Sequence, residues 1–188
     1  MKRKFLLLVP VFFVLGLVNP SFAQKANRPG KWATSIPSKY LTNLFRVSDD
    51  VYRSEQPTHD AFVELSGMGV KSVLNLRTTE KDDEIIGGIN IKPYLVSMDA
   101  GDFTDNDIID ALKAIADAPK PILIHCRHGS DRTGVVVAMY RIILQDWPKE
   151  DALDELMNGG YGFHTYYKNI PEYIKNVNVE SIRSQLKK

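Results

Sequence analysis

The stretch from residue 121 to residue 134, PILIHCRHGSDRTG, decides the fold that we expect for this chain of 188 residues. Its first part, residues 121–124, is a short apolar run introduced by a proline, which is typical of a strand buried on both faces. Residues 135–144 are apolar on nearly every side, which predicts a helix that passes through the core. A tight loop that begins at Cys126 therefore joins a buried strand to a buried helix.

The rest of the chain alternates between strand-like and helix-like segments. We expect a hairpin over residues 44–52, and the charged, glycine-punctuated residues 79–90 indicate a surface connection. Further strands are expected over residues 70–76 and 91–98, and further helices begin near Thr58, Thr104, Pro148 and Pro171. This alternation predicts a three-layer α/β domain with a mostly parallel central sheet flanked by helices.

The loop at the end of the buried strand has the composition of a phosphate site. Five residues separate Cys126 from Arg132, which allows successive backbone N–H groups to converge on one anion at the start of the following helix. Gly129 permits the backbone angles that such a loop needs. The same field stabilises a cysteine thiolate, and the planar guanidinium of Arg132 can bind two phosphate oxygens. The sequence thus predicts a nucleophile and an oxyanion cradle in one loop.

The neighbours of these two residues receive supporting roles. The Thr133 hydroxyl is expected to hydrogen-bond the sulfur of Cys126, and His125 to orient the loop from behind. Asp131 places a carboxylate beside the arginine, where it weakens the positive potential unless its side chain points outward. The phosphate-binding cradle is expected to consist of Arg127, His128, Gly129, Ser130 and Asp131.

Three motifs carry a resemblance to known enzymes. Residues 125–134 resemble the His-Cys-x5-Arg-Thr-Gly signature of the cysteine-dependent tyrosine and dual-specificity phosphatases. Residues 51–57, VYRSEQP, resemble the opening motif of small atypical dual-specificity phosphatases. Residues 138–147, together with the glycine pair at 159–160, are similar to bacterial periplasmic tyrosine phosphatases of the TpbA type.

This resemblance implies a dual-specificity-phosphatase-like fold and hydrolysis of phosphomonoesters through a cysteinyl-phosphate intermediate. Cys126 is then the nucleophile and Arg132 the phosphate-binding arginine, and no cofactor is required. The implied substrate is a phosphorylated protein, foremost phosphotyrosine and also phosphoserine or phosphothreonine, or a small phosphorylated molecule.

The general acid has no fixed spacing in this family. Four carboxylates of the acidic loop at residues 99–107 are candidates: Asp99, Asp102, Asp105 and Asp107. Asp102 is favoured because it stands two residues before the helix cap at Thr104, as in some members of the family.

Other functions are open at this point. A metal site made by His125, Cys126 and His128 is disfavoured, because the three residues are crowded together without a second ligand cluster. A phosphatase of inositol phosphates or other small polyanions is the main alternative, since Arg127 and His128 can contact extra phosphates. A non-catalytic phosphate-binding module is a third possibility, against which the intact cysteine and arginine argue.

The first residues indicate export. Basic residues at positions 2–4, an apolar run over residues 5–18 and small residues up to Ala23 predict a cleavable signal peptide over residues 1–23. Residues 24–39 are expected to form a flexible leader ahead of a catalytic domain over residues 40–188. Cleavage leaves 21 basic and 23 acidic residues, a net charge of −2. We therefore expect a periplasmic or secreted protein with no nucleic-acid partner and no stable membrane insertion.

Overall fold

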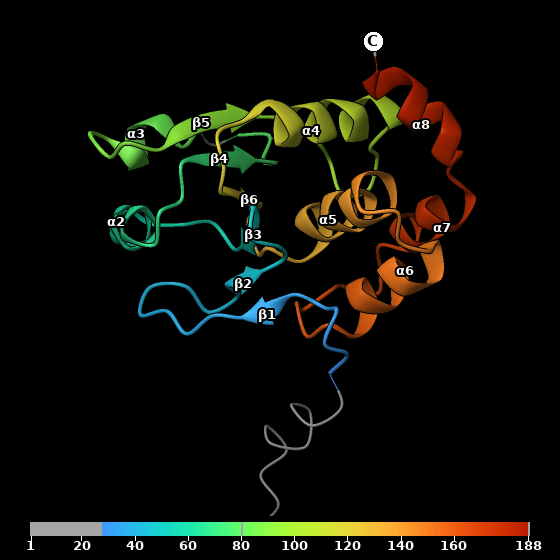
Figure 1. Cartoon of the computed structure of the whole chain (residues 1–188), viewed down its shortest axis with the longest axis horizontal. Coiled ribbons are helices and arrows are strands. Elements are labelled where there is room, and N and C mark those ends of the chain that lie inside the picture. Colours follow the sequence, from blue (N-terminus) through green and yellow to red (C-terminus); the bar gives the residue numbers. More distant parts are fainter. Residues whose placement is uncertain (1–27, 80, 188) are drawn as a thin grey trace, which may run out of the picture.

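A six-stranded mixed sheet organises the computed structural model, which describes residues 28–79 and 81–187 (Figure 1). The strands are β1 (Thr34–Ser35), β2 (Phe45–Arg46), β3 (Val51–Ser54), β4 (Ser72–Asn75), β5 (Lys92–Leu95) and β6 (Ile122–His125). They lie in the order β1-β2-β3-β6-β4-β5. From β3 to β5 all neighbours are parallel, whereas β1, β2 and β3 pair antiparallel. The sheet is therefore mostly parallel, with β6 in its interior.

Helices cover both faces of the sheet. They are α2 (His59–Gly67), α3 (Asp83–Ile86), α4 (Asp105–Asp117), α5 (Asp131–Leu144), α6 (Lys149–Asn158), α7 (Asn169–Asn176) and α8 (Val179–Leu186). Figure 1 shows α2 on one side of the sheet and α5, α6 and α7 on the other. Leu123 packs into the core beneath α2, whereas Ile122 and Ile124 pack into the core beneath α4 and α5. The predicted three-layer α/β domain is confirmed.

Capping side chains fix where two of the helices begin. The Thr58 hydroxyl accepts a hydrogen bond from the N–H of Ala61 at the start of α2. At the start of α4, Thr104 and Asp107 bond each other's backbone N–H in a reciprocal capping box. Both helices begin where the sequence predicts them to begin.

The connection at residues 79–90 differs from the prediction of a solvated surface segment. It contains α3, whose Ile86 is 3% exposed, and Asp82 just before that helix is only 2% exposed. Asp82 is stable in this buried position because its carboxylate accepts hydrogen bonds from the side chains of Gln56 and Asn75.

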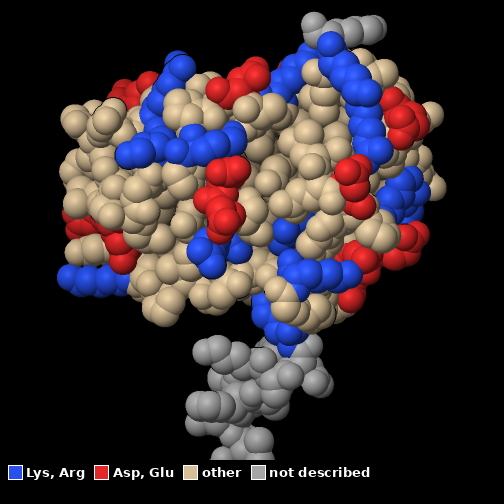
Figure 2. Space-filling model, in the orientation of Figure 1, with Lys and Arg blue, Asp and Glu red and all other residues tan. Residues whose placement is uncertain are grey.

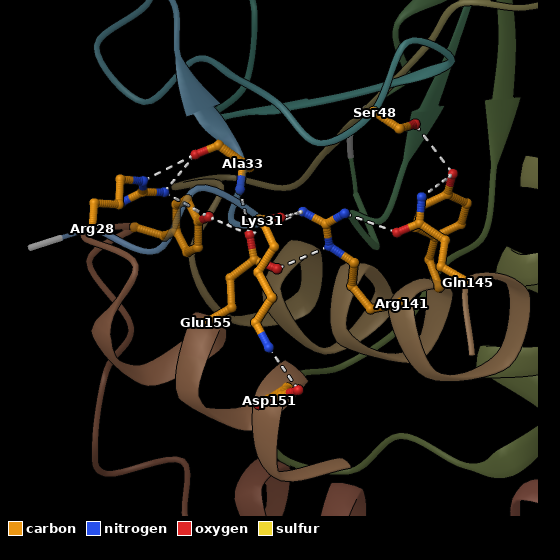
Figure 3. A network of polar contacts seen from close by, with 10 residues as sticks. Arg28, Lys31, Ala33, Ser48, Arg141, Gln145, Asp151 and Glu155 are labelled. Atoms are coloured by element: carbon orange, nitrogen blue, oxygen red, sulfur yellow. Dashed lines mark hydrogen bonds and ion pairs between the residues drawn. The ribbon is translucent and has the colours of Figure 1, made fainter. Parts of the chain in front are cut away.

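The described part of the predicted flexible leader is packed against the domain. Ala33 is fully buried, and its N–H donates to Glu155 Oε1 over 2.6 Å. Arg28 donates to the carbonyl of Ala33 and to the hydroxyl of Tyr161. Figure 3 shows how these contacts join an ion pair between Arg141 of α5 and Glu155 of α6. From residue 28 onward the chain is therefore part of the fold, because a buried carboxylate and two helices hold it.

Charge is mixed over the surface seen in Figure 2, where basic and acidic side chains alternate among uncharged ones. None of the helices in the described part of the chain is long and apolar enough to cross a membrane. The predicted signal peptide, residues 1–23, lies outside the described residues.

Candidate active site

The predicted phosphate loop lies at the carboxyl end of β6, between that strand and helix α5. Strand β6 ends at His125, beside Ser54 of β3 and Asn75 of β4. Cys126 follows, is 3% exposed and lines a cavity of about 240 Å³. Arg132, in the first turn of α5, lines the same cavity. The fold thus brings the predicted nucleophile and the predicted phosphate-binding arginine to one cavity.

Contacts behind the loop fix the direction of its peptide groups. The carbonyl of Arg127 accepts from the N–H of Gln56, that of His128 from the side chain of Asn43, and that of Gly129 from Arg53 Nη2 over 2.6 Å. In a trans peptide the carbonyl and the next N–H point in opposite directions. The N–H groups of residues 128–130 therefore point away from these partners, as an anion-binding loop requires.

Gly129 allows the loop to lie directly on strand β3. Its φ is +69°, and a Cβ built at this position would stand 2.5 Å from the backbone of Ser54. No residue with a side chain fits there without moving the loop or the strand. Arg53, 1% exposed with its guanidinium 3.6 Å from the ring centre of Tyr161, supports the loop from below.

Backbone carbonyls hold the guanidinium of Arg132. Its Nη1 donates to the carbonyl of Leu76 over 3.3 Å and to that of Met98 over 3.4 Å. These two carbonyls follow β4 and β5, so the sheet itself sets the position of the arginine at the cavity.

A buried carboxylate that sequence analysis missed lies behind His125. Asp82 Oδ2 is 2.7 Å from His125 Nε2, and both side chains are almost completely buried. Asp82 Oδ1 accepts from Gln56 Nε2 and from Asn75 Nδ2. The imidazole therefore has a fixed orientation, with its Nδ1 3.3 Å from the carbonyl oxygen of Cys126. His125 lies behind the loop as predicted, and Asp82 supplies its anchor.

Asp131 and Ser130 tie the loop to a second segment, at residues 161–164. The Asp131 carboxylate accepts from the N–H of His164 over 3.0 Å and lies 2.8 Å from His164 Nδ1. The Ser130 hydroxyl donates to the carbonyl of Tyr161 over 2.7 Å. Asp131 lines the cavity, but its charge is directed to His164, and as the first residue of α5 it complements the helix dipole.

The remaining predicted residues occupy the rim and the helix. Arg127 and His128 are exposed and line the mouth of the cavity. Thr133 is fully buried, and among the described residues its hydroxyl has no hydrogen-bond partner, the Cys126 sulfur included. Within residues 28–79 and 81–187, no three His, Cys, Asp or Glu side chains are grouped to hold a metal ion. That no metal takes part stays a prediction.

The structure separates the four candidates for the general acid. Asp107 closes the capping box of α4, and Asp105 accepts a hydrogen bond from the Tyr173 hydroxyl. Asp99 and Asp102 are both exposed. Ala100, next to Asp99, lines the Cys126 cavity.

Asp99 and Asp102 differ in their surroundings. A Cβ built on Gly101 would lie 3.4 Å from Asp99 Oδ1 and 3.9 Å from the ring of Tyr167, which also lines the cavity. This places the Asp99 carboxylate near the cavity wall. Asp102 makes no hydrogen bond to another described residue. The contacts favour Asp99, while the role assigned to Asp102 stays a prediction.

The fold and the site together define a class of protein. A cysteine and an arginine share one cavity at the end of a buried parallel strand, and the carbonyls of the loop between them bond to segments behind it. This is the arrangement of a cysteine-dependent phosphatase.

Comparison with known proteins gives the family. The model of the tyrosine phosphatase family matches residues 40–188, and the chain belongs to that family. It is 30% identical over 173 residues to the dual specificity protein phosphatase TpbA of Pseudomonas aeruginosa, an alignment that covers 91% of this chain and 78% of TpbA. It is also 31% identical over 125 residues to the inositol diphosphatase DSP3 of Arabidopsis thaliana, covering 61% of this chain and 60% of DSP3.

Solved structures agree with this assignment. A Cys-to-Ser variant of Pseudomonas aeruginosa TpbA in complex with pTyr matches 86% of this chain and 99% of its own, with a TM-score of 0.77 and 28% identity. The catalytic core of the PP-IP phosphatase SIW14 from Saccharomyces cerevisiae, in complex with citrate, matches 80% of this chain and 93% of its own, with a TM-score of 0.67 and 26% identity. The predicted family and the predicted phosphatase activity are confirmed.

Proposed function

We propose that this phosphatase acts on phosphotyrosine in proteins and that Cys126 carries the phosphate during the reaction. The observation that carries the proposal is the cavity that Cys126 and Arg132 share at the end of β6. The similarity to TpbA supports the choice of substrate, because a TpbA variant has been solved in complex with pTyr.

The geometry supports a reaction in two steps. The Cys126 thiolate attacks phosphorus, an S–P bond forms, and the P–O bond to the leaving group breaks. Arg132 and the N–H groups of the loop bind the phosphate oxygens throughout. A carboxylic acid of the acidic loop donates its proton to the leaving oxygen. Water then attacks phosphorus, the same carboxylate takes a proton from that water, and Cys126 leaves as a thiolate.

Inositol phosphates are the second candidate substrate. Arg127 and His128 are exposed at the mouth of the cavity, where they can meet further phosphate groups. The relatives of plant and yeast origin named as inositol or PP-IP phosphatases support this candidate.

The substrate is tested by comparing kcat/KM for a phosphotyrosine peptide, the matching phosphoserine peptide and an inositol diphosphate. We expect the phosphotyrosine peptide to be turned over fastest. Preference for the inositol diphosphate would favour the second candidate. Cys126→Ser serves as the control and should bind vanadate without turnover. Absence of turnover in the wild type would indicate a phosphate-binding module.

We also infer that the protein works outside the cytoplasm, in the periplasm or as a secreted protein. The basic start, the apolar run over residues 5–18 and the small residue at Ala23 support this inference. Cell fractionation with mass determination of the mature chain tests it. A chain that begins after Ala23 in the periplasmic or culture fraction is expected, and a full-length chain in the cytosol would contradict export.

A further inference from the structure

An aromatic segment lies beside the Cys126 cavity and has no role in the phosphate chemistry described so far. Residues 161–167, YGFHTYY, which we call the aromatic loop, connect α6 to α7. Tyr166 and Tyr167 of this loop line the cavity. Tyr166 is 69% exposed, an unusual degree for a large aromatic side chain, whereas Tyr167 is half-buried.

The rings of this region form a continuous wall. The ring centroids of Tyr166 and Tyr167 are 4.5 Å apart, and that of His164 is 5.3 Å from that of Tyr166. His128 of the phosphate loop continues the series, at 5.6 Å from His164. Aromatic rings at such separations interact favourably, and the exposed ring of Tyr166 within the series offers a further face to a partner ring.

The wall is fixed to the phosphate loop. Asp131 accepts from the backbone N–H of His164 and contacts its ring nitrogen. The Tyr161 carbonyl accepts from the Ser130 hydroxyl and from the Asn43 side chain, which also bonds the carbonyl of His128. The distance between the wall and Cys126 is therefore set by direct bonds to the same loop that holds the nucleophile.

The wall is also compatible with a nearby phosphate. Burial raises the pKa of the Tyr167 phenol above its ordinary value of 10.0, so this phenol is neutral at physiological pH. Two described carboxylates lie near Tyr167: Asp131 is engaged with His164, and Asp99 accepts a hydrogen bond from the N–H of Gly101. A neutral aromatic surface beside an anion cradle matches a substrate that joins a phosphate directly to an aryl ring.

We propose that Tyr166 and Tyr167 form a platform for the phenyl ring of phosphotyrosine, and that Asp131 and His164 position this platform relative to Cys126. The proposal rests on the proposed function and names the residues that select its substrate. The phosphoserine side chain has no ring to lie on the platform. An inositol ring carries hydroxyl and phosphate groups, and it gains more from cations such as Arg127 than from an aromatic face.

Tyr166→Ala tests the platform, with Tyr166→Phe as the conservative variant. Tyr40→Ala is the matched control, because Tyr40 is 40% exposed and does not line the cavity. We expect Tyr166→Ala to lower kcat/KM for a phosphotyrosine peptide about tenfold, mainly through KM, since a well-placed aromatic pair contributes about that factor. Hydrolysis of the matching phosphoserine peptide and inhibition by vanadate should change less than about twofold, as should all values for Tyr166→Phe and Tyr40→Ala.

His164→Ala tests the positioning role. It should raise KM for the phosphotyrosine peptide more than KM for the matching phosphoserine peptide, since the freed charge of Asp131 affects both substrates alike. This preference should change little when His164→Ala is combined with Tyr166→Ala, because both changes remove the same platform. Fully additive effects would contradict the positioning role.

Two results would overturn the platform. One is an unchanged KM for the phosphotyrosine peptide in Tyr166→Ala, and the other is an equal loss on phosphotyrosine, phosphoserine and vanadate, which indicates damage to the cradle. In both cases wild-type turnover of phosphotyrosine leaves the proposed function intact. A wild type without turnover of phosphotyrosine would instead overturn the proposed function, and the platform with it.

Discussion

The phosphate loop and the acidic loop face the same cavity but are held in different ways. The carbonyls of residues 127–129 bond to side chains or N–H groups of neighbouring segments, and Arg53 and His125 beneath them are buried. In the acidic loop, Asp99 and Asp102 are exposed, and the Asp99 carboxylate bonds only the N–H of Gly101 among the described residues. The groups that bind phosphate are thus held by contacts to the strands and segments behind the loop, whereas both candidates for the proton donor lie on an exposed loop.

This difference leads to a general expectation. Substitutions in the phosphate loop and behind it should lower stability and activity together, because the same contacts carry both. Substitutions of exposed carboxylates in the acidic loop should lower activity and leave stability unchanged.

Gly129→Ala should have the largest combined effect on stability and activity, because its added Cβ disturbs both the loop and strand β3. The added Cβ would meet the backbone of Ser54 at 2.5 Å, at a φ of +69°. We expect a loss of about 3 kcal/mol or more in the free energy of unfolding and a fall in kcat/KM of about 100-fold or more from the displaced loop. Gly160→Ala is the matched control, because its φ is +76° but no atom lies within 4 Å of the added Cβ. It should cost only about 1–2 kcal/mol and leave activity unchanged. Equal effects of the two variants in urea unfolding and in kinetics would contradict the close packing at Gly129.

Replacing the general acid should lower activity without lowering stability, in contrast to Gly129→Ala. Asp99→Asn is expected to slow phosphotyrosine hydrolysis by about 100-fold or more, the usual contribution of proton donation, with unchanged thermal stability. The effect should be much smaller for an activated aryl phosphate, whose leaving group departs without a proton. Asp102→Asn is the parallel variant, and a large substrate-dependent loss there, with normal rates in Asp99→Asn, would restore Asp102 as the acid.

Asp82→Asn probes the buried support behind His125. The amide cannot accept all three hydrogen bonds that the Asp82 carboxylate receives from Gln56, Asn75 and His125. Unless the His125 imidazole changes tautomer, one buried donor is left unsatisfied, which costs about 1–3 kcal/mol. We expect kcat/KM to fall about tenfold, because a slightly displaced loop binds the transition state less well. The exposed neighbour Asp83→Asn is the control. Normal stability and activity in Asp82→Asn would show that the loop does not depend on this anchor.

Tyr161→Phe should have the smallest effect, and mainly on stability. The Tyr161 hydroxyl donates to Glu155 and accepts from Arg28, so its loss costs about 1–2 kcal/mol. Burial raises the pKa of Tyr161 to about 12, above the ordinary value of 10.0. In the unfolded chain this phenol ionises first, so its stabilising contribution is complete below pH 10 and is lost as the pH rises towards 12.

The pH dependence of unfolding checks this account of Tyr161. Urea unfolding from pH 7 to pH 11 should give a steeper alkaline loss of stability in the wild type than in Tyr161→Phe. Equal slopes of the free energy of unfolding against pH in the two proteins would contradict the raised pKa of Tyr161. Activity at pH 7 should change less than about twofold, because the hydroxyl does not reach the cavity.

The parts of this site that sequence analysis predicted are those fixed by local order along the chain. Cys126 and Arg132 lie at the two ends of a short loop between a buried strand and a buried helix. This succession brings them together without any contact from distant parts of the chain. The start of α4 at Thr104 was equally predictable, because a capping box is a contact between residues three apart.

The parts that were missed depend on contacts between distant residues. Asp82 lies in a charged stretch that resembles a solvated loop, and its role follows only from its meeting with His125, 43 residues later. The anchoring of Asp131 by His164, 33 residues later, is of the same kind. Residues 28–33 are polar enough to indicate a leader, but buried partners such as Glu155 order them. No local pattern encodes such pairings.

The central claim is that the phosphate loop holds Cys126 as the atom that receives the phosphate. Rapid acid quenching during turnover of a phosphotyrosine peptide, followed by mass spectrometry of the digested protein, tests it most directly. We predict a phosphate adduct on Cys126 that accumulates within the first turnover and is absent from Cys126→Ser. A phosphate adduct on His125 or His128 instead, or normal turnover by Cys126→Ser, would contradict the account.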